Sequence, residues 1–366
     1  MSYQPLVSLG MPVYNGQNFM AATLDSLLAQ TCGDFELIIC DNASTDDTEA
    51  IGRAYAARDP RVRYHRNESN IGASANYNLT FEMGRGRYFK WAAHDDLCAP
   101  TFLERCVAAL ETDPDVVLAY TQAEAIDGDG HTVKVYPGKH HFGDPQARVR
   151  FYEFVLDPHP VVAVFGVMRR DALARTRLIG AYTGSDRPLL SELSLLGKFY
   201  EVPEQLFFYR FHEAQSWGGN KSQQAQQAWY DPRRAGKLTF PQWRLLREHL
   251  RSIARSPVGL RDRAACYLYM GYWMRSGIDP GAAVGTIGQR LFVVQMHDLH
   301  ELSGDGHDVP WGTGAGRIRE FLEEVHRQGV KPIKFGLEYS YDWEDSMPEV
   351  EQSARFFDQV TLDLAK

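Results

Sequence analysis

The sequence has few cysteines and no long hydrophobic run, and both absences narrow the class of protein. Its five cysteines are an odd number and form no C-x-x-C pair, so we expect reduced, mostly buried thiols rather than a zinc or redox site. The longest apolar run, at residues 161–168, is too short to cross a bilayer, which needs about 20 residues. The first residues lack the basic and apolar pattern of a secretory signal, so we expect a cytoplasmic protein.

The sequence also lacks a net positive charge. A formal charge of −8 over 366 residues argues against non-specific nucleic-acid binding, and we expect no nucleic-acid partner. Hydrophobic residues make up 44% and charged residues 23%, as in ordinary globular proteins, so disorder is not expected. The length predicts a main domain with appended segments.

The first hundred residues alternate short apolar runs with helix-like patterns. The runs PLVSLGM, FELIIC and RYFKWAA predict strands, and stretches such as DDTEAIGRAYAA between them predict helices. This alternation predicts an α/β domain with a parallel sheet. Ligands of such sheets bind outside the carboxyl ends of the strands, where this sequence places PVYNG, DNASTDD, NESNIGAS and HDD.

Three parts are expected along the chain. Residues 1–220 would form the α/β domain, residues 221–289 a helical extension, and residues 290–366 a short strand–helix–strand–helix tail.

Within the helical part, residues 241–255 combine an apolar face with a row of arginines. We favour a solvated basic face on an ordinary helix, and the alternative is docking to anionic lipid or to a lipid-linked substrate at the inner face of the membrane. The expected apolar face consists of Trp243, Leu246, Leu250 and Ile253, and the basic face of Arg244, Arg247, Arg251 and Arg255.

Two adjacent carboxylates, Asp95 and Asp96, follow the run RYFKWAA. Such neighbours repel each other, so the pair is costly unless water, a cation or a hydrogen-bond donor compensates it. Asp41 ends another apolar run, where a carboxylate could bond a base or a ribose. The loops PVYNG and RNESNIGASAN precede helices, which favours phosphate, but neither has the glycine spacing of a P-loop or a dinucleotide site.

Taken in order, these motifs resemble the family 2 glycosyltransferases. Their GT-A fold is a Rossmann-like, mostly parallel sheet with helices on both faces. The resemblance implies metal-assisted, inverting transfer of a sugar from a nucleotide-diphosphate donor, with a UDP-sugar favoured, to a glycan or lipid-linked acceptor in cell-surface polysaccharide synthesis. It rests on VSLGMPVYNG, FELIICDNASTDDT, RNESNIGASANYN, GRYFKWAAHDDL and YTGSDRPLLSEL…FYEVPEQLFFYRFHEAQS, and covers residues 6–217.

The resemblance also implies roles for individual residues. Asp95 would reach the ribose region and Asp96 would hold Mg²⁺ or Mn²⁺ on the diphosphate, although the fuller motif has an Asp where this chain has Ala93. Asp41 would meet the base, with Arg66 near it. The positions that would hold the nucleotide or line the donor pocket are Pro12, Tyr14, Asn15, Asp41, Asn42, Arg66, Asn70, Gly72 and Asn76.

Later motifs would complete the reaction site. Asp186 matches the catalytic base that takes a proton from the acceptor hydroxyl, and its neighbour is Ser185 where the family more often has Glu. By itself, the residue would be read as a helix N-cap. Arg210 and His212 match an R-x-H element that closes over the diphosphate or the metal.

The tail from Arg290 onward resembles the last βα units of xylose isomerase-like TIM barrels. In that group His297 and Glu338 would match two metal ligands, but the other ligands and most of the eight-stranded barrel are missing. We interpret the tail as a fused remnant or as a packing and oligomerisation element. Two alternatives stay open: a metal-dependent sugar isomerase acting through the tail, and a protein that binds a nucleotide sugar without turnover.

Overall fold

The computed structural model divides the chain into two compact units, Met1–Tyr269 and Met270–Lys366. The three-part division expected from the sequence stays a prediction. The residues that the structure describes are 4–136, 138, 142–156, 161–212, 227, 229–232, 241–278, 293–296, 318–327, 334–337 and 347–364.

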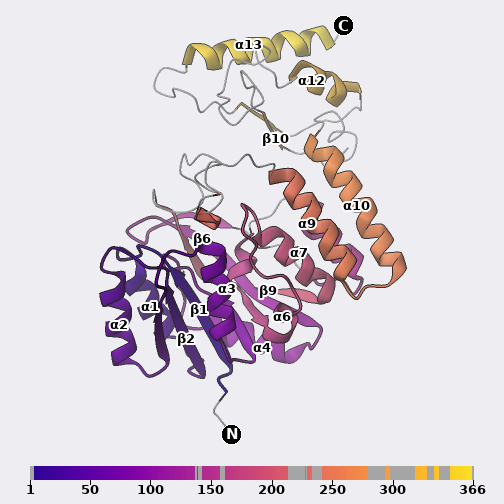
Figure 1. The fold of residues 1–366 in the computed structure, drawn as a ribbon. Coiled ribbons are helices and arrows are strands. Elements are labelled where there is room, and N and C mark those ends of the chain that lie inside the picture. Colours follow the sequence, from indigo (N-terminus) through magenta and orange to yellow (C-terminus); the bar gives the residue numbers. More distant parts are fainter. Residues whose placement is uncertain are drawn as a thin grey trace. The chain divides into compact units, whose positions relative to one another are not determined.

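A nine-stranded sheet runs through the described part of the first unit (Figure 1). The strand order is β3-β2-β1-β4-β8-β6-β9-β5, with β7 paired to β6. Parallel ladders join β1 to β2 and β4, β2 to β3, and β6 to β9, whereas β5, β7 and β8 pair antiparallel. The strands are β1 (Val7–Val13), β2 (Phe35–Asp41), β3 (Val62–Arg66), β4 (Tyr88–Trp91), β5 (Leu97–Cys98), β6 (Val116–Ile126), β7 (Thr132–Tyr136), β8 (Val167–Arg169) and β9 (Lys198–Arg210).

Helices cover both faces of this sheet, because its strands are apolar on both sides. Every residue of β1 and β2 is buried, as expected for parallel strands inside an α/β domain. One apolar cluster packs Val7, Leu9 and Met11 against α1 and α4, and a second packs Phe89 and Trp91 on the α3 and α7 side. The helices are α1 (Met20–Leu28), α2 (Thr48–Arg58), α3 (Ala73–Met83), α4 (Phe102–Thr112), α5 (Ala147–Leu156), α6 (Arg170–Ala174), α7 (Asp186–Leu196), α9 (Pro241–Arg255) and α10 (Leu260–Ile278), with a 3-10 turn at Val161–Phe165.

The predicted alternation of strands and helices is confirmed from β1 to β4. Each crossover brings a helix back onto the sheet, and at one point α3 approaches β1 so closely that only glycine fits. A Cβ on Gly10 would lie 2.5 Å from Thr80 Oγ1. The longest apolar run of the sequence forms the 3-10 turn and most of β8, not one long element.

The face predicted for α9 was right for Ile253, which is buried, and for Arg247, Arg251 and Arg255, which are exposed, but it was wrong for Trp243. Trp243 is 59% exposed, whereas Glu248 and His249 are buried. The reason lies in distant partners: Glu248 pairs with Arg177, and His249 is hydrogen-bonded to Ser191 on α7 (2.9 Å). These contacts turn polar residues of α9 inward, which a rule that buries only apolar residues does not foresee.

The second unit contains the expected strand–helix–strand–helix order. β10 (Val293–Met296) and β11 (Lys334–Leu337) pair in parallel, and α12 (Ile318–Arg327) and α13 (Met347–Leu364) follow them. The likeness of this tail to an isomerase barrel stays a prediction. Within the described residues, no helix combines the length and the hydropathy needed to span a membrane.

Candidate active site

The carboxyl ends of the first strands lie side by side. Val13 pairs with Asp41 and Asp41 pairs with Arg66, so the loops after β1, β2 and β3 leave the sheet at one edge. The loop after β4 leaves from the same edge, and its His94 carbonyl accepts a hydrogen bond from Thr23 Oγ1 on α1 (2.9 Å). The structure therefore brings the four polar loops of the sequence together.

Asp41 is wholly buried at the end of β2 and is fully engaged by the protein. Its Oδ2 accepts hydrogen bonds from Tyr64 Oη and Arg66 Nη1, each 2.6 Å long, and its Oδ1 accepts one from the Ser44 N–H (2.8 Å). Burial alone would raise the pKa of this carboxyl, but the hydrogen bonds from Ser44, Tyr64 and Arg66 outweigh it and lower the pKa. Asp41 is therefore a stable anion that fixes Arg66 at the strand edge.

The loops after β1 and β2 are tied together by Asn15. It has a positive φ of 53°, donates its N–H to Ser44 Oγ (2.9 Å) and accepts the Thr45 N–H on Oδ1 (2.9 Å). Pro12 is buried within β1, whereas Tyr14 is 42% exposed. Of these three candidates, Tyr14 and Asn15 are exposed to a ligand and Pro12 is not.

Asparagines brace the loop after β3. Asn42 Nδ2 donates to Asn70 Oδ1 (2.9 Å), and Asn67 Nδ2 donates to both Asn42 Oδ1 (3.1 Å) and Asn76 Oδ1 (3.0 Å). Asn76 Nδ2 in turn donates to a β2 carbonyl (2.7 Å). Gly72 has a φ of 87° and donates its N–H to Asn70 Oδ1 (2.9 Å). The predicted donor-pocket residues therefore build the shape of this loop.

Asp95 and Asp96 lie between β4 and β5 and differ sharply in their surroundings. Asp95 Oδ2 is 3.0 Å from His212 Nε2, and although burial opposes ionisation, His212 and His94 lower the pKa of Asp95. Asp96 is 4% exposed, and its Oδ1 accepts the Arg210 N–H (2.9 Å). Its Oδ2 is buried and has no hydrogen-bond partner in the described part of the chain.

The unpartnered oxygen makes Asp96 costly as an anion. Burial, and then the charge of Asp95, raises the pKa of Asp96 well above its ordinary value, with Arg210 and Lys90 offsetting only part of the effect. A buried carboxylate oxygen without a partner is uncommon in folded proteins, and a hard divalent cation is a partner of the right chemistry. The residues present therefore fit a metal ion at this pair.

Arg210 binds the loop that contains Asp95 and Asp96, called the acidic loop below. Its Nε donates to the Asp95 carbonyl (2.9 Å) and its Nη1 to the carbonyls of Asp127 (2.9 Å) and Gly128 (2.8 Å). Its guanidinium also lies 4.8 Å from the centre of the Phe19 ring. These bonds hold the acidic loop against the turn between β6 and β7, and the expected role of Arg210 toward the diphosphate stays a prediction.

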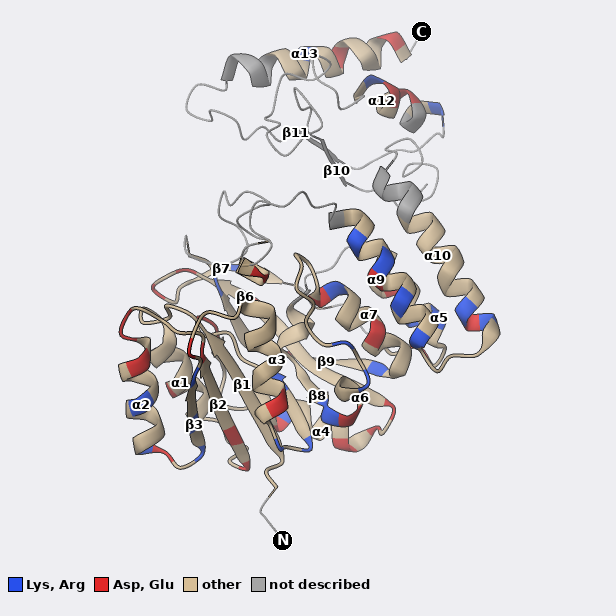
Figure 2. Cartoon of the chain, in the orientation of Figure 1, with Lys and Arg blue, Asp and Glu red and all other residues tan. Residues whose placement is uncertain are grey.

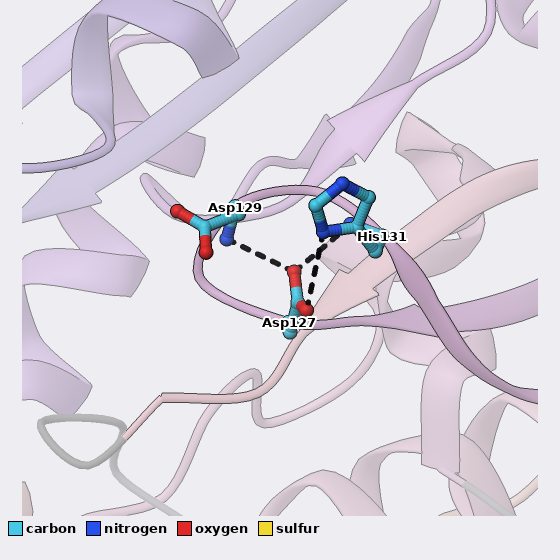
Figure 3. A group of neighbouring side chains, drawn as sticks. All are labelled: Asp127, Asp129 and His131. Atoms are coloured by element: carbon cyan, nitrogen blue, oxygen red, sulfur yellow. Dashed lines mark hydrogen bonds and ion pairs between the residues drawn. The ribbon is translucent and has the colours of Figure 1, made fainter.

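The turn between β6 and β7 contains a second cluster of possible metal ligands, shown in Figure 3. Ligand atoms of Asp127, Asp129 and His131 lie within 4.8 Å of one another. The Oδ1 of Asp127 accepts the N–H groups of Asp129 and His131 (2.9 Å each), which is the hydrogen bonding of an Asx-type turn. Turn geometry therefore accounts for this group without a cation.

Asp186 begins α7, as expected. Its Oδ1 accepts the Arg187 N–H (2.9 Å), and it forms no ion pair with any described residue. Burial raises the pKa of Asp186, and Arg187 offsets only part of that effect. A carboxylate with a raised pKa is a better proton acceptor near neutral pH.

Two tyrosines that were not predicted as site residues, Tyr77 and Tyr230, have pKa values raised by burial and by carboxylates of the site. Burial, and then the charge of Asp186, raises the pKa of Tyr230. Burial raises the pKa of Tyr77 as well, and Asp95, Tyr230 and Asp96 add to it. A long-range packing arrangement of this kind leaves no local signal. Tyr64 could have been found, because it lies two residues before Arg66 and so shares its face of β3.

The predicted metal ligands His297 and Glu338 lie outside the described residues.

Comparison with known proteins agrees with the motifs. Residues 8–176 match the model of the glycosyl transferase family 2 domain. An uncharacterized glycosyltransferase of Rickettsia typhi is 36% identical over 133 residues, which are 36% of this chain and 41% of that protein. Chondroitin synthase of Escherichia coli is 34% identical over 129 residues, which are 35% of this chain and 19% of that protein. The chain thus spans about two fifths or less of these relatives.

Solved structures give the fold. S. aureus TarS, residues 1–349, superposes with a TM-score of 0.54 at 13% identity, covering 78% of this chain and 81% of that chain. The same protein in complex with UDP-GlcNAc gives a TM-score of 0.56 at 12% identity, covering 88% and 80%. The predicted GT-A fold is confirmed.

Proposed function

Since the chain carries a family 2 glycosyltransferase domain, we propose that it transfers a sugar from a nucleotide-diphosphate donor to an acceptor hydroxyl with inversion at the anomeric carbon. The observation that carries the proposal is the unpartnered Oδ2 of Asp96, beside Asp95, at the sheet edge where the polar loops meet.

The donor nucleotide would lie over the loops after β1, β2 and β3. Tyr14 offers an exposed ring for stacking, and Arg66, whose side chain is 31% exposed, offers a guanidinium that also binds Asp41. Asp41 is too enclosed to meet a base unless Arg66 or Tyr64 moves. UDP is the favoured nucleotide, because TarS, which shares the fold, is solved with UDP-GlcNAc.

Mg²⁺ or Mn²⁺ would be held by Asp95 and Asp96, and when bound it would offset the charge of the donor diphosphate. His212 is bonded to Asp95 and orients that carboxylate in the described structure. Its expected place as a further metal ligand stays a prediction, as does the effect of Ala93 in place of an acidic residue.

Asp186 is the proposed base. It would take the proton of the acceptor hydroxyl as that oxygen forms its bond to the anomeric carbon and the bond to the nucleoside diphosphate breaks. The raised pKa of Asp186 fits this role. A glycan or a lipid-linked molecule of cell-surface polysaccharide synthesis is the proposed acceptor, and membrane contact and oligomer formation remain part of the proposal.

Calorimetric titration of UDP and GDP, with and without Mn²⁺, tests the donor site. We expect UDP to bind only with metal, and a subsequent screen of UDP-sugars to reveal turnover. Absence of binding by either nucleotide in both conditions would reject the proposal. Binding without turnover of any donor would instead favour a protein that binds a nucleotide sugar without catalysis.

A further inference from the structure

A cavity of about 370 Å³ lies where α9 meets α7 and the segment before it, and Asp95 and Asp96 are not among its lining residues. Its volume is within the usual range of small-molecule sites. Figure 2 shows the basic residues of α9 beside α7. The charged residues that line the cavity are Arg177, Arg244, Arg251, Arg255, Glu192 and Glu248.

The lining is positive because arginines outnumber the carboxylates that they meet. The Glu248 side chain is 4% exposed and pairs with Arg177, Arg244 (2.9 Å), Arg247 (2.9 Å) and Arg251 (3.2 Å). One carboxylate needs one cation for neutrality, so these pairs leave an excess of positive charge on a protein with a net charge of −8. Mutual repulsion of the arginines makes this arrangement costly unless an anion joins it.

Two of the lining arginines have N–H donors that form no hydrogen bond with the described residues. Arg251 meets Glu248 with one terminal nitrogen at 3.2 and 3.4 Å, and its side chain is 55% exposed. Arg255 is exposed and forms no hydrogen bond or ion pair with other described residues. A guanidinium has five N–H donors in a fork that matches phosphate oxygens, so both side chains can bind a phosphate group.

The cavity is lined in part by α7, the helix that begins with the residue proposed as catalytic base. Pro188, which lines it, stands two positions after Asp186 on α7, and Tyr182, another lining residue, lies just before that helix with the Arg244 guanidinium 4.7 Å from its ring centre. A group bound here would be held by the helix that carries Asp186 and not by the loops that would hold the nucleotide.

We propose that this cavity binds a phosphate group carried by the acceptor. The assignment of the ligand to the acceptor rests on the proposed glycosyl transfer, whereas the binding of phosphate rests on the cavity and its arginines alone. The group could be the headgroup of a lipid or the phosphate of a water-soluble molecule, since both present the same oxygens.

The test is calorimetry with glycerol 3-phosphate at low salt, in the presence of Mn²⁺ and saturating UDP to block the donor site. The variants are Arg251→Gln and Arg255→Gln, and the control is Arg247→Gln, which removes the same charge from the same helix at a residue that does not line the cavity. We expect the lining variants each to weaken binding roughly tenfold and the control less than about twofold.

Equal weakening by all three variants, or no binding of glycerol 3-phosphate by the wild type, would overturn the proposal. Binding to vesicles with and without phosphatidylglycerol identifies the source of the phosphate. Vesicle binding that glycerol 3-phosphate competes away and that Arg255→Gln weakens indicates a lipid headgroup. Binding of glycerol 3-phosphate without binding of the vesicles indicates a soluble acceptor. A protein that binds UDP but no phosphate ester would contradict this inference only. One that binds the ester in the cavity but no UDP would contradict the glycosyl transfer and leave the phosphate site standing.

Discussion

Two buried carboxylates at the same sheet edge are in opposite states. Asp41, at the end of β2, is surrounded by donors from Ser44, Tyr64 and Arg66, and its pKa is lowered. Asp96, in the loop after β4, has one oxygen without a partner among the described residues, and its pKa is raised. The fold stabilises the first by itself, whereas the second requires something from outside. We therefore infer that Asp41 stabilises the fold, and we propose that Asp96 takes part in binding a ligand.

The variant with the largest expected effect on the difference between Asp41 and Asp96 is Asp96→Asn. The amide keeps the oxygen that accepts the Arg210 N–H, but it is a poor ligand for a cation. The rate of sugar transfer should therefore fall by roughly 10³-fold, and metal-dependent binding of UDP should be lost as well. Because the variant removes a poorly compensated buried charge, urea unfolding at pH 7 should show equal or greater stability. A variant that is both inactive and clearly less stable would contradict the account.

Asp186→Asn separates chemistry from donor binding. Loss of a general base should lower kcat by roughly 10²- to 10⁴-fold, whereas UDP should bind with Mn²⁺ as in the wild type. Steady-state assays and calorimetry on the same preparation make the comparison. If the variant lost UDP binding in parallel with kcat, Asp186 would belong to the donor site instead.

Asp41→Asn tests the other carboxylate. The amide nitrogen or a weaker acceptor would face Arg66 and Tyr64, and a buried ion pair would lose one partner. We expect a loss of about 3 kcal/mol in the free energy of unfolding. Equal stability of Asp41→Asn and Asp96→Asn in parallel urea titrations would remove the distinction drawn between the two carboxylates.

A third buried titratable group, His249, differs from the two carboxylates because it is held in its neutral form. Burial, and then Arg187 and Arg177, lowers the pKa of His249 from 6.5 to about 3. Between about pH 6.5 and pH 3, the unfolded chain therefore binds a proton at His249 that the folded chain does not bind. The contribution of neutral His249 to the free energy of unfolding is fully present above about pH 6.5 and is lost as the pH falls toward 3.

The matched variant is His249→Asn, which can keep the bond to Ser191 and does not titrate. Between pH 7 and pH 5, the wild type should lose roughly 2 kcal/mol of unfolding free energy relative to this variant, as measured by urea denaturation. Parallel losses in the two proteins would show that His249 is protonated in the fold.

The local parts of this structure could be predicted from the sequence, and the long-range parts could not. The continuous apolar runs of β1 and β2 and the polar residues that follow them place the loops at the sheet edge by periodicity alone. Whether a carboxylate is satisfied depends on residues far away in the chain. Asp96 and Arg210 are 114 positions apart, and no pattern near Asp96 indicates which of its oxygens lacks a partner.

The inward turn of α9 has the same cause. Arg177 and Glu248 are 71 positions apart, so a helical wheel of α9 cannot show that a glutamate belongs inside. The arginines that appeared as a solvated face are organised around that glutamate and beside a cavity.

The most direct measurement is Mn²⁺ electron paramagnetic resonance, with UDP present, on the wild type, Asp96→Asn and Asp129→Asn. Asp129 is the control, because it belongs to the second cluster of possible metal ligands near the site. We expect UDP-dependent binding of Mn²⁺ in the wild type and in Asp129→Asn, and none in Asp96→Asn. Binding that survives in Asp96→Asn and disappears in Asp129→Asn would contradict this expectation and move the metal to the turn between β6 and β7.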